Sequence, residues 1–506
     1  MRLGVDFGTT TTTVAVADRG NYPAVSFIDH NGDAQDDIPS VVGWSNSALV
    51  FGFDALRAMD EDEAPLIRSI KRLLSDSSMT PRSTFRLAQR DISIMDALVG
   101  FLEYVAFKVR TDSSLAQIPQ SEPLEAAIGI PAHASSAQRF LTLEAFRAAG
   151  WSVISMVNEP SAAGFEYTHR HRGTLNSKRT SILVYDLGGG TFDASTVTAV
   201  DTDHQVLASR GHTMLGGDDF DLVLAQCFAK AGDIPLNSFA ESEWQDLVEQ
   251  SRTVKESLTA HTRVVSAVVH DRPVSLPVST FYEAATPLVE KTLEVLSPLL
   301  QRTEDGALAL PPECAGIYVT GGASSLPLVS RILRERFGRR VHRSPHAAAS
   351  TAIGLAIAAD PDAGFTLHDR LARHVGVFRE AESGSLVSFD TLLSPNLQIE
   401  SNKETTITRQ YRAAHNIGFY RFVEFTQTDH VGTPLGDVTP LGEILFPFAP
   451  ALQEPDISLA NIHIARTGNG PLIEERYHVD RHGIVTVEIC DLDTGYSLTS
   501  ALTSGA

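Results

Sequence analysis

The stretch ILVYDLGGGTFDAS (residues 182–195) has a shorter counterpart near the N-terminus, LGVDFGTTTTTVAV (residues 3–16). In each, an apolar run ends in Asp. After Asp come one further residue, a Gly, and several small or hydroxylated residues, and then a second apolar run begins. Two apolar runs joined by a glycine-containing turn predict a β-hairpin. Because the aspartates at positions 6 and 186 are about 180 residues apart, the repetition indicates a duplicated domain with one hairpin in each half.

The composition of the two turns indicates a phosphate-binding site. Glycine lets the backbone approach a bulky anion, so that successive N–H groups can point at phosphate oxygens. The carboxylates of Asp6 and Asp186 would repel phosphate unless a divalent cation lay between them. For either hairpin alone, a tight turn with a capping aspartate is an equally good interpretation. The presence of both favours two phosphate loops that hold a polyphosphate from opposite sides.

Composition excludes several classes of function. The formal net charge of −21 argues against non-specific binding to nucleic acid or to acidic membranes, because both need a basic face. The three cysteines are too few for a disulfide framework, which favours a reducing compartment. The N-terminus has no signal-peptide pattern, and no stretch approaches 18 apolar residues. We therefore expect a cytoplasmic protein that binds neither nucleic acid nor membrane.

The pattern of elements changes once along the chain. Up to about residue 360, short runs rich in Val and Ile alternate with segments of helical period, such as SSAQRFLTLEAFRAAGW and FYEAATPLVEKTLEVLSPLLQR. This predicts an α/β fold with mixed sheets and a helix capped by Ser135 or Ser136. From about residue 370, short runs with period-two alternation are separated by Gly, Pro, Asn and Asp. That part predicts a separate all-β domain.

Several motifs resemble those of one protein family and occur in its order: VDFGTTTT, IKRLL, IGIPAHASSAQR, VNEPSAAGFEY, YDLGGGTFD, HTMLGGDDFDLVL and VTGGASSLP. The chain resembles the seventy-kilodalton heat-shock protein chaperones, within the actin and sugar-kinase ATPase superfamily. The resemblance implies a two-lobed, actin-like ATPase domain with duplicated ribonuclease H-like halves over residues 1–362. An interdomain linker would follow at 363–374, and a β-sandwich domain similar to the family's peptide-binding domain at 375–506.

The resemblance also implies ATP or ADP with Mg²⁺ as cofactors, and Asp6 and Asp186 would hold the metal through water. Catalytic roles would fall to Lys71, Glu159, Asp186 and Thr191. Without the motif, Lys71 would be interpreted as a surface lysine, and Glu159 as a capping residue before Pro160. The residues implied to bind the nucleotide are Asp6, Gly8, Thr9, Thr10, Thr11, Gly188, Gly189, Gly190, Gly216, Gly217, Lys255, Thr259, Gly321, Gly322 and Ser325.

The chain departs from the family pattern at three places. In the helix that clasps adenine, Arg252 stands where the family has an acid, and Ser325 stands where many members have an arginine that stacks on the base. Loss of that cation predicts stacking weaker by roughly 1 kcal/mol. The linker has only Leu367, Asp369 and Leu371 in common with the family's leucine-rich run. We also expect no helical lid in this chain, which stops at Ala506.

Communication between domains and peptide binding are implied for further residues. Pro131 and Arg139 match the proline and arginine that pass the nucleotide state to the neighbouring domain; by themselves they are a turn proline and a surface arginine. Most apolar residues of a small β domain form its core, which is the alternative for each peptide-binding candidate. These candidates are Leu386, Val387, Phe389, Ile417, Phe419 and Phe422.

Three functions remain open from the sequence. The first is an ATP-dependent chaperone-like protein that hydrolyses ATP slowly and binds unfolded or extended polypeptide, together with a co-chaperone and a nucleotide-exchange factor. The second is a nucleotide-binding adaptor with little or no hydrolysis, whose β domain binds one dedicated protein partner. The departures at the adenine site and linker favour this adaptor. A small-molecule kinase of the same superfamily is the third, and the β domain and the GGDDFD segment argue against it.

Overall fold

The structure is a computed structural model. It describes residues 1–503 except 63, 75, 77–78, 116–117, 133, 172–174, 177, 201–202, 213, 305, 365, 372, 382–385, 396, 401–403, 431 and 455. The chain divides into two compact units. Unit 1 comprises Met1–Arg72, Tyr104–Ala132 and Val157–Thr366, and unit 2 comprises Leu73–Glu103, His133–Met156 and Leu367–Ala506.

Unit 1 contains two sheets that repeat one local strand order. In the first, β1 (Arg2–Phe7) pairs antiparallel with β2 (Thr11–Val16) and parallel with β11 (Glu125–Ile130). In the second, β13 (Ser181–Leu187) pairs antiparallel with β14 (Phe192–Val200) and parallel with β20 (Cys314–Thr320). The two predicted hairpins are therefore present, and each lies beside a parallel third strand, as expected of a duplicated domain.

The remaining elements of these sheets and their helices follow in chain order. The further strands of unit 1 are β3 (Phe27–Ile28), β4 (Ala34–Gln35), β5 (Ile38–Pro39), β6 (Val41–Ser45), β7 (Ala48–Phe51), β8 (Leu66–Arg68), β15 (Asp203–His212), β16 (Val264–Val269), β17 (Arg272–Pro277), β18 (Gln301–Arg302), β19 (Leu308–Ala309) and β21 (Val341–Arg343). Its helices are α1 (Gly52–Asp62), α5 (Glu159–Arg170), α6 (Gly217–Ala231), α7 (Glu241–Glu256), α8 (Val278–Leu296), α9 (Pro327–Phe337) and α10 (Ser350–Ala359). Helices α2 (Ile70–Leu73) and α3 (Ile94–Thr111) and strand β12 (Ser152–Asn158) cross between the units in sequence.

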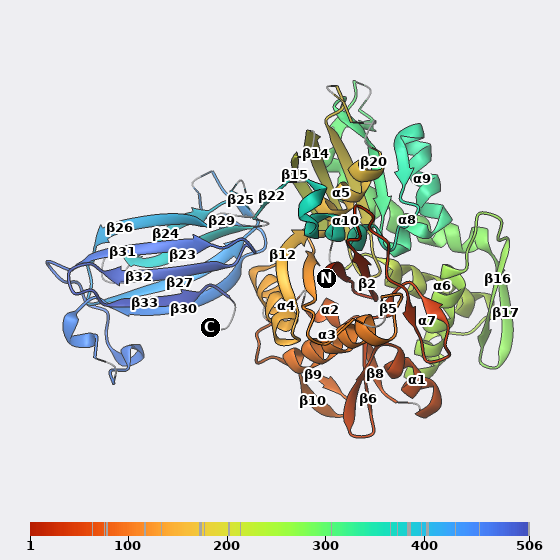
Figure 1. The fold of residues 1–506 in the computed structure, drawn as a ribbon, viewed down its shortest axis with the longest axis horizontal. Coiled ribbons are helices and arrows are strands. Elements are labelled where there is room, and N and C mark those ends of the chain that lie inside the picture. Colours follow the sequence, from red (N-terminus) through yellow and green to blue (C-terminus); the bar gives the residue numbers. More distant parts are fainter. Residues whose placement is uncertain are drawn as a thin grey trace. The chain divides into compact units, whose positions relative to one another are not determined.

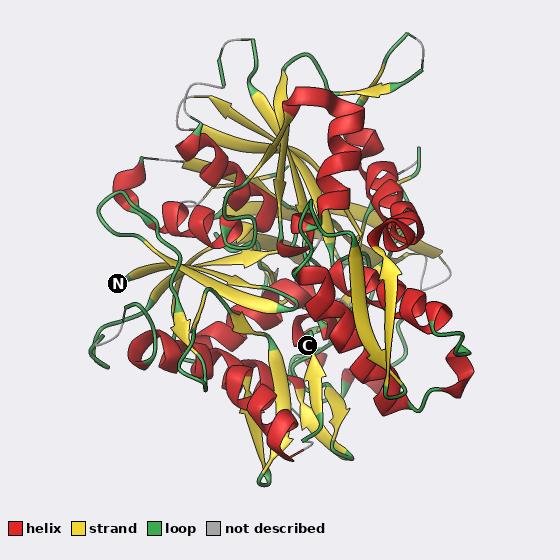
Figure 2. Cartoon of the chain, turned by 90° about the vertical axis from the view of Figure 1, so that its right-hand side faces the viewer, coloured by secondary structure: helices red, strands yellow, loops and turns green. Residues whose placement is uncertain are grey.

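Helices cover both faces of the second sheet, as Figure 1 and Figure 2 show. Successive side chains of a strand point to opposite faces, and β13 is buried on both. Leu183 and Tyr185 pack into the core formed with α6, α7, α8 and α9, whereas Ile182 and Val184 pack against α5. Burial on both faces explains why this strand is a continuous apolar run rather than an alternating one.

The first sheet is crossed closely by α10. A Cβ added to Gly4 on β1 would lie 2.2 Å from the backbone oxygen of Ala352, and one added to Gly354 would lie 1.7 Å from that of Ala162 on α5. The two glycines therefore allow α10 to contact both β1 and α5 through backbone atoms. This contact fixes the start of α5, which carries Glu159, relative to the strand that ends at Asp6.

Unit 2 contains a β-sandwich of two four-stranded antiparallel sheets. One has the order β24-β23-β27-β30 and the other the order β26-β31-β32-β33. Their inner faces share one core, which includes Val377, Phe422, Tyr477 and Val487. The strands of unit 2 are β9 (Thr84–Leu87), β10 (Arg90–Ser93), β22 (Thr366–Arg370), β23 (His374–Ala381), β24 (Leu386–Leu393), β25 (Gln398–Glu400), β26 (Thr405–Arg412), β27 (Ile417–Phe425), β28 (Gln427–Thr428), β29 (Pro434–Leu435), β30 (Thr439–Pro447), β31 (Leu472–Val479), β32 (Val485–Asp491) and β33 (Ser497–Ala501).

The predicted fold class is confirmed: a mixed α/β fold with a repeated sheet, followed by an all-β sandwich. Helix α4 (Ser136–Ala148), also in unit 2, has Ser135 as its N-cap, with the Ser135 hydroxyl accepting from the backbone N–H of Gln138. None of the described helices combines the length and apolar character that a membrane span requires.

Candidate nucleotide site

The turns of the two hairpins lie against each other in unit 1. A Cβ added to Gly189 would lie 2.2 Å from Cγ2 of Thr10, and one added to Gly190 would lie 2.7 Å from Cγ2 of Thr9. Real Cβ atoms do not come this close to other heavy atoms. The glycines of one turn therefore leave room only for the threonines of the other, and the structure brings together the two loops that the sequence predicts to bind phosphate.

A third loop, which leads into α6, closes around the second hairpin. The backbone N–H of Gly217 donates to the oxygen of Gly188 at 2.9 Å, and that of Asp218 donates to the oxygen of Gly189 at 2.7 Å. A Cβ on Gly216 would lie 2.5 Å from the Gly189 oxygen. Gly216 and Gly217 thus belong to the same glycine-lined region as the hairpin turns.

A fourth loop approaches the end of β13. Gly321 has φ of +84°, and a Cβ there would lie 2.4 Å from Oδ1 of Asp186 and 2.3 Å from the backbone oxygen of Leu187. Only glycine fits such a position without strain. Gly322, the next residue, is exposed, and a Cβ there would meet no atom within 4 Å.

A buried ion pair lies between the two sheets of unit 1. Nζ of Lys71 on α2 donates to Oε1 of Glu159 at 2.6 Å, and the side chains of the two residues are 5% and 11% exposed. Burial lowers the pKa of Lys71, but the carboxylates of Glu159 and Asp6 outweigh burial, so that the pKa of Lys71 lies above its usual value. The lysine is therefore a fixed positive charge, and it is not the surface residue that its helical pattern alone would suggest.

Further carboxylates surround this pair. Burial and the charge of Glu159 raise the pKa of both Asp6 and Asp186 to about 8. A Cβ on Gly129 would lie 3.2 Å from Cγ of Glu159 and 3.6 Å from Oδ1 of Asp6, so one glycine separates these two acids. Each raised pKa reports that the ionised carboxylate lacks compensating positive charge.

Asp193 is a further acid of this cluster that we did not predict. It lies opposite Asp186 in the β13–β14 pairing, is 5% exposed, and has a pKa raised to about 7 by burial and by Glu159. Thr191, two positions earlier, is partly exposed, and its backbone oxygen accepts from the N–H of Gly188. The motif YDLGGGTFD contained the signal, because pairing of the strands on either side of its turn places Asp193 opposite Asp186.

The cluster fits a hydrated divalent cation. Four carboxylates share one lysine, and Lys71 lowers the pKa values of the three aspartates by less than burial and Glu159 raise them. In the described part of the chain, no three His, Cys, Asp or Glu side chains come close enough to ligate a metal ion directly. The arrangement therefore suits Mg²⁺, which keeps several of its waters and takes few protein ligands.

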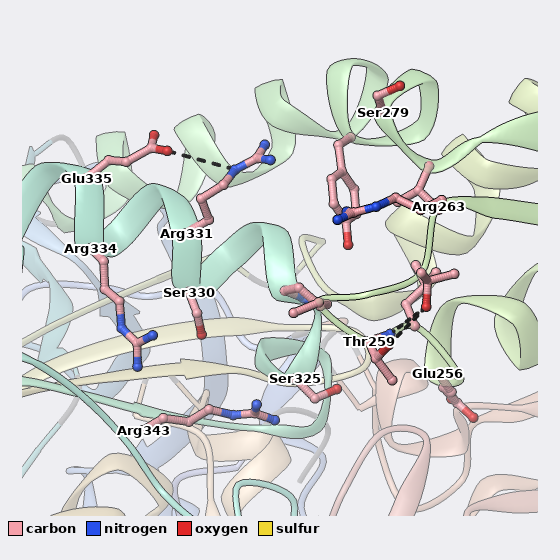
Figure 3. A pocket seen from close by; sticks show the side chains of 16 residues that line it. Glu256, Thr259, Arg263, Ser279, Ser325, Ser330, Arg331, Arg334, Glu335 and Arg343 are labelled. Carbon is pink, nitrogen blue, oxygen red and sulfur yellow. Dashed lines mark hydrogen bonds and ion pairs between the residues drawn. The ribbon is translucent and has the colours of Figure 1, made fainter.

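A pocket of about 1060 Å³ in unit 1 contains the candidate base-binding residues Thr259 and Ser325 (Figure 3). Such a volume is at the upper end of the range for small-molecule sites. Figure 3 shows Arg343 extending along the pocket toward Ser325, with Arg331 on the opposite wall from α9. The guanidinium of Arg331 lies 5.3 Å from the centre of the Tyr282 ring. Arginine is thus present in the pocket although it is absent at position 325.

Arg252 is held by acids of α6 rather than directed toward that pocket. Its guanidinium pairs with Oδ1 of Asp218 at 2.9 Å and with Oδ2 of Asp221 at 3.2 Å. Lys255, one turn later on α7, pairs with Oδ1 of Asp221 at 2.6 Å and donates to the backbone oxygen of Gly217 at 2.9 Å. The GGDDFD motif by itself indicates no such role for these aspartates.

In unit 1, Gly8 donates its N–H to the oxygen of Asp6, and a Cβ on Gly8 would lie 2.3 Å from the backbone oxygen of Thr11. Pro131 follows β11 directly and is partly exposed. In unit 2, Nη1 of Arg139 donates to the backbone oxygen of His482 at 3.1 Å, and Arg139 is only 5% exposed. Arg139 is therefore a buried residue of α4 and not a surface arginine.

The peptide-binding candidates of the β-sandwich differ in exposure. Ile417 and Phe422 are at most 1% exposed and are inaccessible in this arrangement. Val387 is 50% exposed, and Phe389 and Phe419 are partly exposed. The side chain of Leu386 and the linker side chains of residues 365–370 and 372 lie outside the described residues.

The repeated sheet and the glycine loops define an actin-like ATPase fold with a β domain. Residues 104–374 match the family model described as Hsp70 protein, and the chain belongs to the Hsp70 family. A Chaperone protein HscA homolog of Tolumonas auensis is 32% identical over 368 residues, which cover 71% of this chain and 57% of that protein. Chaperone protein HscA of Shigella boydii serotype 18 is 31% identical over 399 residues, 74% of this chain and 62% of that protein. The chain spans about three fifths of the length of the curated relatives it matches.

Proposed function

We propose that this protein binds ATP with Mg²⁺, hydrolyses it slowly to ADP and phosphate, and binds extended or unfolded polypeptide through its β-sandwich. The observation that carries the ATPase part is the cluster of Lys71, Glu159, Asp6, Asp186 and Asp193 beside four glycine-lined loops. This combination supplies what phosphoryl transfer needs, namely positioning and charge neutralisation.

The proposed reaction is an in-line attack of water on the γ-phosphorus. The new bond joins the water oxygen to phosphorus, and the bond from the γ-phosphorus to the β–γ bridging oxygen breaks. Mg²⁺, held through water by Asp6 and Asp186, would neutralise charge on the phosphates. Lys71 places its ammonium at the γ-phosphate, and Thr191 and Glu159 orient the water.

Asp193 is the best candidate to accept the proton from the attacking water. Its pKa of about 7 matches the value at which a general base is most effective near neutral pH. Asp6 and Asp186, with pKa values of about 8 in the absence of a cation, become ionised once a cation compensates their charge. Slow turnover follows because Lys71 is already committed to Glu159 and must share its hydrogen bonds with the phosphate.

Family membership and the HscA relatives, which are named as chaperone proteins, support the chaperone part of the proposal. A cytoplasmic location and partners such as a co-chaperone and an exchange factor are also proposed. The domain boundaries proposed are 1–362, 363–374 and 375–506.

The alternative is an adaptor that binds the nucleotide without hydrolysing it. The ion pairs of Arg252 with Asp218 and Asp221 favour it, because they engage the residue that stands where the family has an acid to clasp adenine. Release of phosphate from ATP by the purified protein, with and without an unfolded polypeptide, distinguishes the proposals. An ATPase chaperone releases phosphate without any acceptor and is stimulated by polypeptide, whereas an adaptor shows neither. Phosphate transfer only in the presence of a small-molecule acceptor would indicate a kinase.

A further inference from the structure

The β-sandwich contains a pocket of about 380 Å³ that is rich in arginine. It opens between the two sheets, because its walls come from β23, β24 and β27 of one sheet and from β26 of the other. This volume lies at the lower end of the range for ligand pockets, and it is large enough for one or two side chains of a peptide. Its charged lining residues are Arg379, Asp390, Arg409, Arg412 and Arg466.

The floor of the pocket is a buried polar network. Arg379 donates from Nε to Oε1 of Glu475 at 3.1 Å and also pairs through Nη2 with Oε2 of the same carboxylate. Glu475 is fully buried, and the hydroxyls of Tyr411 and Tyr477 donate to it. A buried charge needs such complete pairing, because an unpaired one is strongly destabilising. Glu475 therefore neutralises Arg379, and the floor carries no free charge for a ligand.

The mouth of the pocket is lined by three further arginines, Arg409, Arg412 and Arg466, and by one carboxylate, Asp390. Arg409 pairs with Asp390 at 3.0 Å, and Asp390 is shared with Arg379. Arg412 is 67% exposed and reaches Asp493, outside the pocket lining, only at 3.6 Å. Exposed pairs of this kind contribute about 0–1 kcal/mol, so their arginines can turn to a new partner at little cost.

Aromatic side chains form the rest of the wall. Phe419 is partly exposed at the pocket, Phe448 is 4% exposed behind it, and the hydroxyls of Tyr411 and Tyr420 lie 2.6 Å apart. An apolar side chain of a ligand can therefore pack on Phe419 while a neighbouring carboxylate meets the arginines. Arginine forks bind carboxylates through two parallel hydrogen bonds, which gives this contact its selectivity.

From the four arginines, the single lining carboxylate and the aromatic wall, we infer that this pocket binds an acidic peptide segment with an apolar residue beside its carboxylates. The inference rests on the proposed polypeptide binding of the β-sandwich and names the class of polypeptide. It differs from the sequence-based expectation, in which the contacts to the peptide are apolar. The chain as a whole has a net charge of −21, whereas the lining of this pocket has four arginines and one acid.

The test uses the full chain and three labelled heptapeptides of the same length, built around a central Phe. The first carries Asp and Glu on both sides of the Phe, the second Asn and Gln at those positions, and the third Lys. We expect the acidic peptide to bind at least tenfold more tightly than the amide peptide at low salt. The difference should shrink in 0.5 M salt, because screening weakens exposed charge pairs.

Two variants and a matched control locate the effect. Arg409→Gln combined with Arg412→Gln should bring the acidic and amide peptides to within about threefold of each other. The double change to Glu should reverse the preference toward the lysine peptide, which a merely destabilised domain would not do. The control is Arg86→Gln, because Arg86 is 65% exposed and paired with Asp91 at 2.9 Å but does not line the pocket; it should keep the full acidic preference.

Two outcomes overturn the inference, and they are distinguishable. If the amide peptide binds as tightly as the acidic one and the arginine variants change nothing, the polypeptide-binding function stands but the acidic selectivity is wrong. If none of the three peptides binds, and an unfolded protein does not bind either, the proposed polypeptide binding itself fails together with the inference.

Discussion

The acids around Lys71 are arranged to hold a charge that the protein alone does not supply. Glu159 accepts a hydrogen bond from Nζ of Lys71 at 2.6 Å. The pKa values of Asp6 and Asp186 are raised to about 8, and that of Asp193 is raised to about 7. Keeping such a cluster costs stability unless a cation binds to it. At the scale of single residues, this cost is the clearest sign of function, because packing alone would favour apolar side chains here.

The pH dependence of stability tests this arrangement. Folding raises the pKa of Asp6 and Asp186 from 3.8 to about 8, so the folded state binds more protons than the unfolded state between these values. The stability that these two groups contribute is therefore fully present below about pH 4 and is lost as the pH rises toward 8. Without nucleotide and Mg²⁺, the Tm should fall by at least about 3 °C from pH 5 to pH 8.

Asp186→Asn should reduce this fall, because the neutral amide has no proton to lose. Asp246→Asn on α7 is the control, since Asp246 is exposed and outside the cluster. Added Mg²⁺ with ADP should raise the Tm more at pH 8 than at pH 5. An unchanged pH slope in Asp186→Asn would show that the carboxylate carries no strain.

The base contacts give a second prediction at this scale. Arg252 is held by Asp218 and Asp221 and, as an arginine, offers no acceptor for the amino group of adenine. The site therefore lacks one contact that would distinguish adenine from guanine. We expect GTP to displace a fluorescent ATP analogue at concentrations within about a hundredfold of those needed for ATP. Displacement by GTP only at a thousandfold higher concentration would exclude relaxed base selectivity.

At the scale of elements, the repeated order of hairpin and parallel strand brings together the two hairpin turns that we propose to bind phosphate. Gly216 lies in the loop that leads into α6. It leaves no room for a side chain there, because a Cβ would lie 2.5 Å from the backbone oxygen of Gly189. Gly216→Ala should therefore displace the loop and weaken binding of ATP and ADP by tenfold or more, measured by calorimetry. Gly468→Ala, where a Cβ meets nothing within 4 Å, should bind as the parent does. Equal affinities in the two variants would mean that this loop does not contact the nucleotide.

The elements of the nucleotide site could be predicted from sequence because local patterns encode them. The runs that end at Asp6 and Asp186 and the cap at Ser135 each depend on a few neighbouring residues. The aspartates of GGDDFD have no role that a local pattern indicates, because their partners come from distant segments. Asp218, for example, pairs with Arg72 and Arg252, and no local pattern shows that these three positions meet.

The same reason explains why the β-sandwich was only partly predicted. The alternation of apolar and polar residues identified its strands, but the charge of the residues that line its pocket depends on which strands pair. Glu475 meets Arg379 across the two sheets, and Tyr411 opposite Ile473 reaches the same carboxylate. Without the register of β26 and β31, the sequence showed only scattered charged residues among apolar ones.

At the scale of the whole molecule, helix α4 contacts the β-sandwich within unit 2. Arg139 donates to His482 at the β31–β32 turn, and the N–H of Ser136 donates to Oε2 of Glu424 on β27 at 3.0 Å. A carboxylate at a helix N-terminus is favourable, and Glu424 is 1% exposed. A ligand shifts an equilibrium only through differential affinity for two states, and we propose that these contacts differ between the two states of this protein.

We therefore expect Arg139→Ala combined with Glu424→Gln to remove any difference in peptide release between ADP and ATP. Hydrolysis without peptide should stay within about twofold of the parent, since neither residue belongs to the acid cluster. Stopped-flow release of a labelled peptide measures the effect, and Arg147→Ala, an exposed change on the same helix, is the control. A nucleotide effect that persists in the double variant would place the coupling elsewhere, and the linker would be the next segment to test.

We propose that the two hairpins and Lys71 form a catalytic site for ATP. Single-turnover hydrolysis by the parent and by Lys71→Met, at enzyme in excess over ATP and with Mg²⁺, tests it most directly. Lys291→Met, an exposed change on α8, is the control. We predict a loss of rate of a hundredfold or more in Lys71→Met, about 3 kcal/mol of transition-state stabilisation, with ATP affinity within about tenfold of the parent. Hydrolysis by Lys71→Met at the parental rate would contradict the account.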